Sequence, residues 1–420
     1  MERKGQILEK ETRPWITDTS FVSPWTYEAR RDMKLPREVT IYDITLRDGE
    51  QFPGLVFRKE DKIRLAEALD RLGVKRLEAG MPAVSQDDFE AVKEIVKRVK
   101  AKVVVFCRGM RSDVDMAVEA GAWGVIVELP SNERLINEGY NWDKKDVIEK
   151  AIDTCNYAKG KGLHTTFFLI DSSGADPGFL ESIVRDVVAR TSIDSITAVD
   201  TFGRLSPEGT KLFVRRMKEW SGLPVEIHVH NDFGLATANS LAAVEAGAEV
   251  VHSSMLGLGE RSGSAPTEEV AVALKFLYGL EPGLNLDRLV ETAKVFQEVS
   301  RIAFPGHKPV IGENSFAFEA GIAAMFSYRL FKQGFPLGVL PYKAEAVGNA
   351  FKIAIGKKAG KFNVLWHLDK TGRTANDEQL QKMVDRIKEL SQRKRRALSN
   401  EEFVKIFDKV ITSKDRKEKR

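Results

Sequence analysis

The sequence predicts an α/β protein: a (β/α)8 TIM barrel with a C-terminal, mainly helical accessory region. From Glu38 onward, apolar strand-like segments alternate with amphipathic segments, and eight such units fit into about 240 residues, the size and rhythm of a (β/α)8 barrel. Most predicted strand cores are continuous Val, Ile and Phe runs, as parallel strands buried on both faces require. An open doubly wound sheet is the alternative. It would need a glycine-rich fingerprint after the first strand, and Arg47-Asp48-Gly49-Glu50-Gln51 is not one.

The alternating segments can be placed in order along the chain. The predicted strands lie at about residues 38–48, 76–80, 102–107, 124–129, 164–171, 195–200, 225–232 and 249–255. The predicted helices lie at about residues 59–72, 86–99, 112–120, 143–160, 177–190, after Pro207, 235–246 and 267–278. The rhythm changes after Gly283, with a helix at about 286–303, a loop-like stretch at 309–316, an apolar helix at 318–331 and terminal helices at 377–396 and 400–413.

We therefore expect three regions: an N-terminal arm over residues 1–37, a catalytic barrel over 38–282 and an accessory region over 283–420. The arm reads as irregular, with several prolines. It carries Trp15 and Trp25, which makes it too apolar for a loose tail. We expect it to pack on its own barrel or on a partner subunit.

Composition excludes several classes of protein. Lys and Arg number 65 against 61 Asp and Glu, a net charge of only +4, so no nucleic-acid partner is indicated. No apolar run approaches about 18 residues, so no membrane partner is expected. The only cysteines are Cys107 and Cys155, which argues against a disulfide framework and favours a reducing cytoplasm.

The strand Val225-Glu226-Ile227-His228-Val229-His230 suggests a metal site. Residues i and i+2 of a strand point to the same face, so His228 and His230 project side by side, with Cβ atoms roughly 6–7 Å apart. Asp48, at the end of the first strand, supplies a carboxylate. Two histidines and one carboxylate make a facial set that leaves positions open for substrate oxygens. The alternative is that the histidines are hydrogen-bonded core residues.

Chemistry in such a barrel lies where the strands end. Polar residues gather at or near the predicted strand ends: Asp48, Glu78, Cys107, Glu128, Asp171, Asp200, Thr201, His228 and His230. Their convergence predicts one site at the C-terminal face of the barrel.

Three motifs in order resemble the metal-dependent, Claisen-condensation-like TIM-barrel enzymes. They are Thr45-Leu46-Arg47-Asp48-Gly49-Glu50-Gln51, His228-Val229-His230-Asn231-Asp232-Phe233-Gly234-Leu235 and Gly257-Leu258-Gly259-Glu260-Arg261-Ser262-Gly263. This family includes the 2-isopropylmalate, homocitrate and citramalate synthases, Re-type citrate synthase and 3-hydroxy-3-methylglutaryl-CoA lyase. The resemblance covers about residues 38–412. Gly312-Glu313-Asn314-Ser315-Phe316-Ala317 and residues 355–361 are similar to the synthase branch.

The resemblance implies an assignment for each matching residue. A divalent cation (Mn, Zn, Co, Fe or Mg) would be held by Asp48, His228 and His230, with Ser264 beside them. Arg47 would stabilise the oxygen that becomes negative when acetyl-CoA attacks a 2-oxo acid, and Glu78 and Thr201 would complete the catalytic set. Gln51 and Thr201 would bind substrate, and Asp171, at the end of the fifth strand, is a further candidate.

The sequence departs from the family at three positions. Ser264 stands where the family has an asparagine at the metal, so we expect a weakly held ion. Ile170 replaces a glutamate of the synthases, and Ala323 replaces a histidine that reaches the partner's active site.

The predicted function is condensation of acetyl-CoA with a 2-oxo acid by a homodimer with exchanged accessory regions. A carbon–carbon lyase and a non-catalytic paralogue remain the alternatives. The lyases use a cysteine in the eighth-strand loop, and residues 257–261 contain none. No feedback by a branched-chain amino acid is expected, because the chain ends near residue 420.

Overall fold

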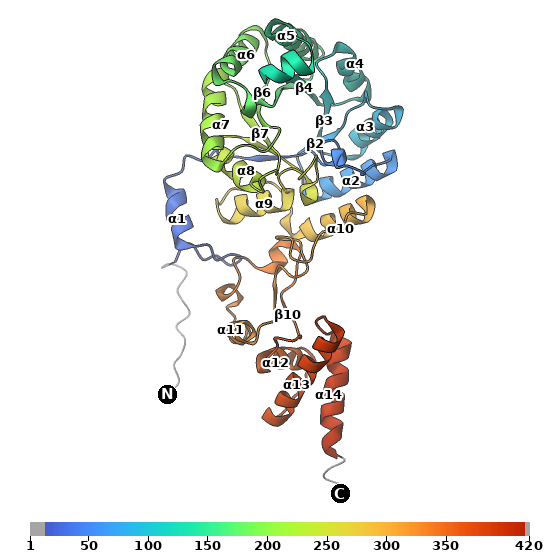
Figure 1. The fold of residues 1–420 in the computed structure, drawn as a ribbon, viewed down its shortest axis with the longest axis vertical. Helices are drawn as coiled ribbons and strands as arrows, with labels where there is room; N and C mark the ends of the chain where they lie inside the picture. Colours follow the sequence, from blue (N-terminus) through green and yellow to red (C-terminus); the bar gives the residue numbers. More distant parts are fainter. Residues whose placement is uncertain (1–12, 416–420) are drawn as a thin grey trace. The chain divides into compact units, whose positions relative to one another are not determined.

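The computed structural model describes the backbone of residues 13–415 and the side chains of residues 13–411. Internal contacts divide the described chain into two compact units: residues 25–304, and residues 13–24 together with 305–415 (Figure 1). The first unit contains the barrel. It also takes in α10 (Leu289–Ser300), a helix that the sequence placed in the accessory region.

Eight parallel strands close into a barrel, which confirms the predicted fold class (Figure 1). The strands are β1 (Thr40–Asp43), β2 (Arg76–Gly80), β3 (Lys102–Cys107), β4 (Gly124–Pro130), β5 (His164–Ile170), β6 (Ser195–Asp200), β7 (Val225–Val229) and β8 (Val250–Ser253). The sheet closes because β8 pairs with β1, with Ile41 opposite Val251. All eight strands therefore end on the same face of the barrel.

Helices connect the strands within a few residues of the predicted bounds. They are α2 (Lys59–Leu72), α3 (Gln86–Arg98), α4 (Arg111–Ala120), α5 (Lys144–Gly160), α6 (Pro177–Arg190), α7 (Pro207–Ser221), α8 (Ala236–Glu245) and α9 (Thr267–Phe276). The side chains of Ser85, Asp143, Asp176 and Ser206 accept backbone N–H bonds at the starts of four helices, and prolines occupy the first positions of α6 and α7. These caps fix where the preceding loops end.

The barrel interior is layered. An apolar layer is formed by the side chains of Tyr42, Ile44, Val104, Phe106, Ile126, Phe168 and Val199. A polar layer also lies inside the barrel, where Glu226 accepts hydrogen bonds from Arg76 and Ser195, all of them buried. A buried charge of this kind is tolerated because it is paired and hydrogen-bonded.

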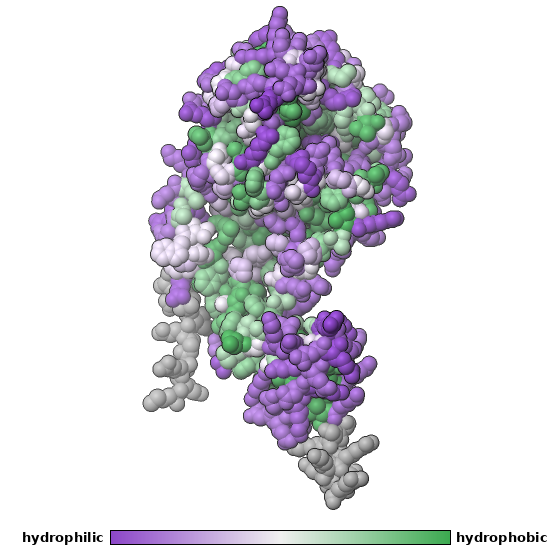
Figure 2. Space-filling model, viewed as in Figure 1, coloured by the Kyte–Doolittle hydropathy of each residue, from purple (hydrophilic) through white to green (hydrophobic). Residues whose placement is uncertain are grey.

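The second unit is mainly helical. It contains α11 (Gly321–Lys332), α12 (Lys361–Lys370), α13 (Asp377–Lys394), α14 (Asn400–Asp415) and the short paired strands β9 (Ala317–Phe318) and β10 (Lys352–Ile353). Its own core packs Met383, Ile387 and Phe403 against α12 residues such as Val364. The helix expected at 318–331 begins three residues later than predicted, and α12 was not predicted. Figure 2 shows apolar surface over α11, where Ile322 is 76% exposed.

The N-terminal arm corrects one expectation, and its residues divide between the two units. It is not irregular throughout, because α1 (Pro24–Arg31) is a helix. From Trp25 onward the arm belongs to the unit that contains the barrel, as expected, whereas residues 13–24 belong with the accessory region: Phe21 N–H donates to Pro341 O, and Lys343 N–H donates to Thr19 O. Trp25 stays 83% exposed. No helix in the described part of the chain is long and apolar enough to cross a membrane.

Candidate active site

Asp48, His228 and His230 converge at the C-terminal face of the barrel. Asp48 lies in the turn after β1, His228 lies on β7 and His230 directly follows it. The two Nε2 atoms are 3.3 Å apart, and they lie 4.0 Å (His228) and 3.8 Å (His230) from Asp48 Oδ1. None of the three residues is more than 5% exposed. The ligand atoms are thus grouped as a metal site requires.

A buried hydrogen-bond chain fixes which nitrogen of His228 carries the proton. Burial opposes the charge of Glu226, but Arg76 and the His252 N–H outweigh burial and lower the pKa of Glu226. Burial lowers the pKa of His228 and His252, so both rings are neutral. His252 Nε2 donates to Glu226 Oε2 at 2.8 Å, which leaves its Nδ1 to accept from His228 Nδ1 at 3.3 Å. The Nε2 atom of His228 therefore presents a lone pair.

The second imidazole is fixed in the same way. His230 Nδ1 lies 3.3 Å from Gly263 O, an oxygen that can only accept, so Nδ1 carries a proton and Nε2 is the nitrogen turned toward the other two side chains. With both Nε2 atoms deprotonated, the two imidazoles and the carboxylate oxygen would present three ligand atoms to one point. Such an arrangement is repulsive by itself and fits a divalent cation. Two imidazoles with one carboxylate suit Mn²⁺, Fe²⁺, Co²⁺ or Zn²⁺ better than Mg²⁺.

Ser264 supports the carboxylate of this set. Its hydroxyl donates to Asp48 Oδ2 at 2.6 Å, and its side chain is 1% exposed. Gly259 leaves the room for this contact, because a Cβ there would lie 2.8 Å from both Asp48 Oδ2 and Ser264 Oγ. A serine at this position thus has a definite partner. Whether its hydroxyl also reaches the ion, as the sequence analysis assigned, stays a prediction.

Arg47 lies beside the triad with one donor to spare. Its Nε donates to Glu78 at 2.9 Å, its Nη1 donates to Gln51 at 3.2 Å, and its guanidinium lies 4.2 Å from the Phe106 ring centroid. Among the described residues, the buried Nη2 of Arg47 and Oε1 of Glu78 have no hydrogen-bond partner. Burial raises the pKa of Glu78 to about 6, although Arg47 lowers it. A substrate oxygen would satisfy the free N–H.

Thr201 and Asp171 contact each other. Thr201 Oγ1 accepts the Asp171 N–H at 2.8 Å, and Asp171 takes a left-handed φ of 54°. The Asp171 carboxylate is engaged by Arg204 at 3.2 Å and Asn132 at 3.0 Å. It is therefore held by neighbouring loops, and its assignment to substrate binding stays a prediction.

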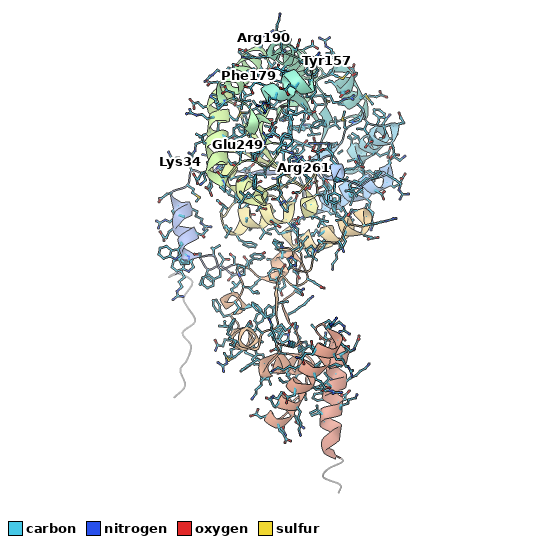
Figure 3. The ribbon with its side chains drawn as sticks, in the orientation of Figure 1. Lys34, Tyr157, Phe179, Arg190, Glu249 and Arg261 are labelled. Carbon is cyan, nitrogen blue, oxygen red and sulfur yellow. The ribbon has the colours of Figure 1, made fainter. Side chains whose placement is uncertain are left out.

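The loop with the third motif is tied to the other strand ends. Arg261, labelled in Figure 3, donates to Asp232 at 2.9 Å and to the carbonyl of Thr201. Asn231 N–H donates to Gly263 O at 2.8 Å. These bonds place Ser264 against Asp48.

Sequence reasoning missed the supporting roles of His252 and Glu226 and left Glu128 without an assignment. Burial raises the pKa of Glu128 to about 7 despite the influence of Arg47. The alternation of side chains along β7 puts Glu226 on the same face as His228. No pattern in the sequence around Glu226 indicates that it pairs with His252 on β8. Ile170 packs on the apolar layer of the barrel, and Ala323 lies on α11 of the second unit.

Comparison with known proteins identifies the family. The family described as HMGL-like matches residues 38–296. The chain belongs to the HMGL-like family. It is 38% identical over 395 residues to "Homocitrate synthase AksA" of Methanopyrus kandleri, covering 93% of this chain and 97% of that one. It is 34% identical over 384 residues to the "Probable 2-isopropylmalate synthase" of Ignicoccus hospitalis, covering 91% and 94%.

Solved structures of the family share the barrel. Hydroxymethylglutaryl-CoA lyase from Pseudomonas aeruginosa superposes with a TM-score of 0.58 at 21% identity, covering 64% of this chain and 96% of that one. At this identity the likeness shows the fold alone. The full-length relatives are synthases, which supports the resemblance to the synthase branch.

Proposed function

We propose that this HMGL-like protein is an acyltransferase that condenses acetyl-CoA with a 2-oxo acid on a divalent cation. The observation that carries the proposal is that synthases align with it over more than nine-tenths of its length, accessory region included. The geometry of Arg47 and the three metal-binding side chains supplies the chemistry. A lyase is not favoured, because the lyase structure covers only 64% of this chain and residues 257–261 contain no cysteine.

Each side chain has a task in such a reaction. A cation held by Asp48, His228 and His230 would act as a Lewis acid toward the keto group of the oxo acid. The reaction joins the methyl carbon of acetyl-CoA to the keto carbon, a methyl proton leaves, and the keto oxygen gains negative charge. The unpartnered Nη2 of Arg47 donates to that oxygen. Glu78 and Gln51 hold the guanidinium in place, so it need not reorganise during the reaction. Water then cleaves the thioester and releases CoA.

Binding roles are proposed for two further residues. Thr201 would receive the carboxylate of the 2-oxo acid, as the resemblance implies, and the Asp171 backbone is bonded to its hydroxyl. We propose a cytoplasmic enzyme without nucleic-acid or membrane partners. The balanced charge and the two free, buried cysteines support this.

We also propose a homodimer with exchanged accessory regions. The apolar side chains of α11 support it, because Ile322 and Phe326 are 76% and 40% exposed. Light scattering at micromolar concentration should give twice the mass of one chain. A single monomeric mass would rule out this assembly.

The activity is tested by following thiol release from acetyl-CoA. The chelator-treated protein is loaded with Mn²⁺ or Co²⁺ and offered pyruvate, oxaloacetate, 2-oxoglutarate and 2-oxoisovalerate in turn. We expect release that needs both an oxo acid and the cation, and that is absent from Asp48→Asn. Release with no dependence on any oxo acid would contradict the proposal.

A further inference from the structure

Glu128 points into the barrel beside the proposed acceptor site. It lies two residues after Ile126 on β4, so both side chains project to the inner face. Its register partner on β5 is Phe168, whose ring lies 5.2 Å from the ring of His228. Phe168 also contacts Phe106, the ring on which Arg47 stacks. The carboxyl of Glu128 thus belongs to the same enclosed space as Arg47 and the triad.

The closed strand order places Glu128 across the barrel from the metal-binding side chains. Asp48 follows β1 and the two histidines belong to β7, and β4 is three strands away from each of them. An acceptor whose keto oxygen lies at the triad and Arg47 must extend the rest of its chain across the mouth of the barrel. The far end of the acceptor therefore approaches β4.

The Glu128 carboxyl has no partner of its own. Among the residues whose side chains are described, none donates a hydrogen bond to it or forms an ion pair with it, whereas Arg47 is bonded to Glu78. Burial raises the pKa of Glu128 to about 7 against the opposing charge of Arg47, and the negative charges of Glu78 and Glu260 contribute to the rise. Ile170, on the adjacent strand, adds no polar group. The far end of the site thus offers a carboxyl that forms no ion pair with a described cation and that becomes negatively charged once the pH exceeds its raised pKa.

We propose that Glu128 selects the acceptor by repelling a second carboxylate, so that the acceptor is a 2-oxo monocarboxylic acid and not a 2-oxo dicarboxylic acid. This rests on the proposed condensation, since it names the substrate class of that reaction. Two carboxylates about 6 Å apart in a partly buried site repel enough to change affinity about tenfold or more.

The test uses two acceptors of equal chain length that differ in charge: 2-oxoglutarate and its 5-methyl ester. Binding to the Mn²⁺-loaded, full-length protein is measured by calorimetry without acetyl-CoA at pH 8, above the raised pKa of Glu128. We expect the wild type to prefer the ester by up to about tenfold, because at pH 8 a carboxyl with a pKa of about 7 can take up a proton at a cost of about tenfold in affinity. Glu128→Gln, which is isosteric and breaks no hydrogen bond, should remove this preference and shift the ratio by about the same factor toward 2-oxoglutarate. Glu138→Gln, the same charge change at an exposed position of the short π-helix Leu135–Gly139, should leave the ratio unchanged.

Each outcome decides the inference. A wild-type preference for 2-oxoglutarate, an unchanged ratio in Glu128→Gln, or no measurable binding of either compound would overturn it. Thiol release measured on the same variants separates the two proposals. If no acceptor supports release, the proposed condensation fails, and the binding ratio still tests whether Glu128 faces the acceptor.

Discussion

Removing the Ser264 hydroxyl should loosen the metal site. Ser264→Ala deletes the donor that lies 2.6 Å from Asp48 Oδ2, in a place where no more than 2% of either residue is exposed. A hydrogen bond to a charged group contributes about 1.5–3 kcal/mol, and about 1.4 kcal/mol is a factor of ten in affinity. We therefore expect Mn²⁺ to bind ten- to a hundredfold more weakly, the scale found for supporting groups around metals.

The assay is calorimetric titration of Mn²⁺ into chelator-treated protein. Ser221→Ala is the matched control, because it deletes a buried hydroxyl that lies at the end of α7, donates to the Met217 carbonyl and accepts the Leu223 N–H. Ser264→Asn brings a carbonyl oxygen toward the ion, and we expect it to tighten binding by a similar factor. Mn²⁺ affinity of Ser264→Ala within twofold of the wild type would refute the role given to the hydroxyl. Weaker binding by Ser264→Asn would show that serine is fitted to this site.

Two further predictions follow from buried charges. Lysine in Arg47→Lys cannot keep the hydrogen bonds to Glu78 and Gln51 and also offer a free donor to the substrate. Turnover should therefore fall about a hundredfold or more, while the affinity for Mn²⁺ stays unchanged. Near-normal turnover would remove Arg47 from the mechanism. Burial raises the pKa of Asp43 from 3.8 to about 7, although hydrogen bonds from Thr45 and Thr267 lower it. The folded state then binds the proton more tightly, so the free energy of unfolding should fall as pH rises from 4 to 7, by at most about 4 kcal/mol. The measurement is the midpoint of thermal unfolding between pH 4 and 7, which should fall less in Asp43→Asn than in the wild type. An equally steep fall in the variant would contradict the role given to Asp43.

Local patterns predicted most of the fold and the convergence of Asp48, His228 and His230. Period-two alternation placed His228 and His230 on one face, and the continuous apolar runs predicted a buried parallel barrel that brings Asp48 to them. Side-chain contacts between neighbouring strands escaped prediction. The pairing of His252 with Glu226 depends on the register between β7 and β8, which no local pattern encodes.

The second unit was harder to predict for similar reasons. Helix α12 has only three buried residues, Asn363, Val364 and Leu368, so its apolar pattern is weak. Residues 13–24 of the arm join the accessory region through backbone bonds such as Phe21 N–H to Pro341 O, which leave no trace in the side-chain pattern. Its two tryptophans indicated packing but not the surface that receives it.

The most direct test of the account is carbon-13 NMR of the product formed from acetyl-CoA labelled at the methyl carbon. With a 2-oxo acid and Mn²⁺ present, the account predicts that the label appears as a methylene carbon next to a new tertiary alcohol carbon, in amounts equal to the thiol released. Label recovered only as the methyl group of acetate would mean hydrolysis without carbon–carbon bond formation. That result would contradict the proposed condensation.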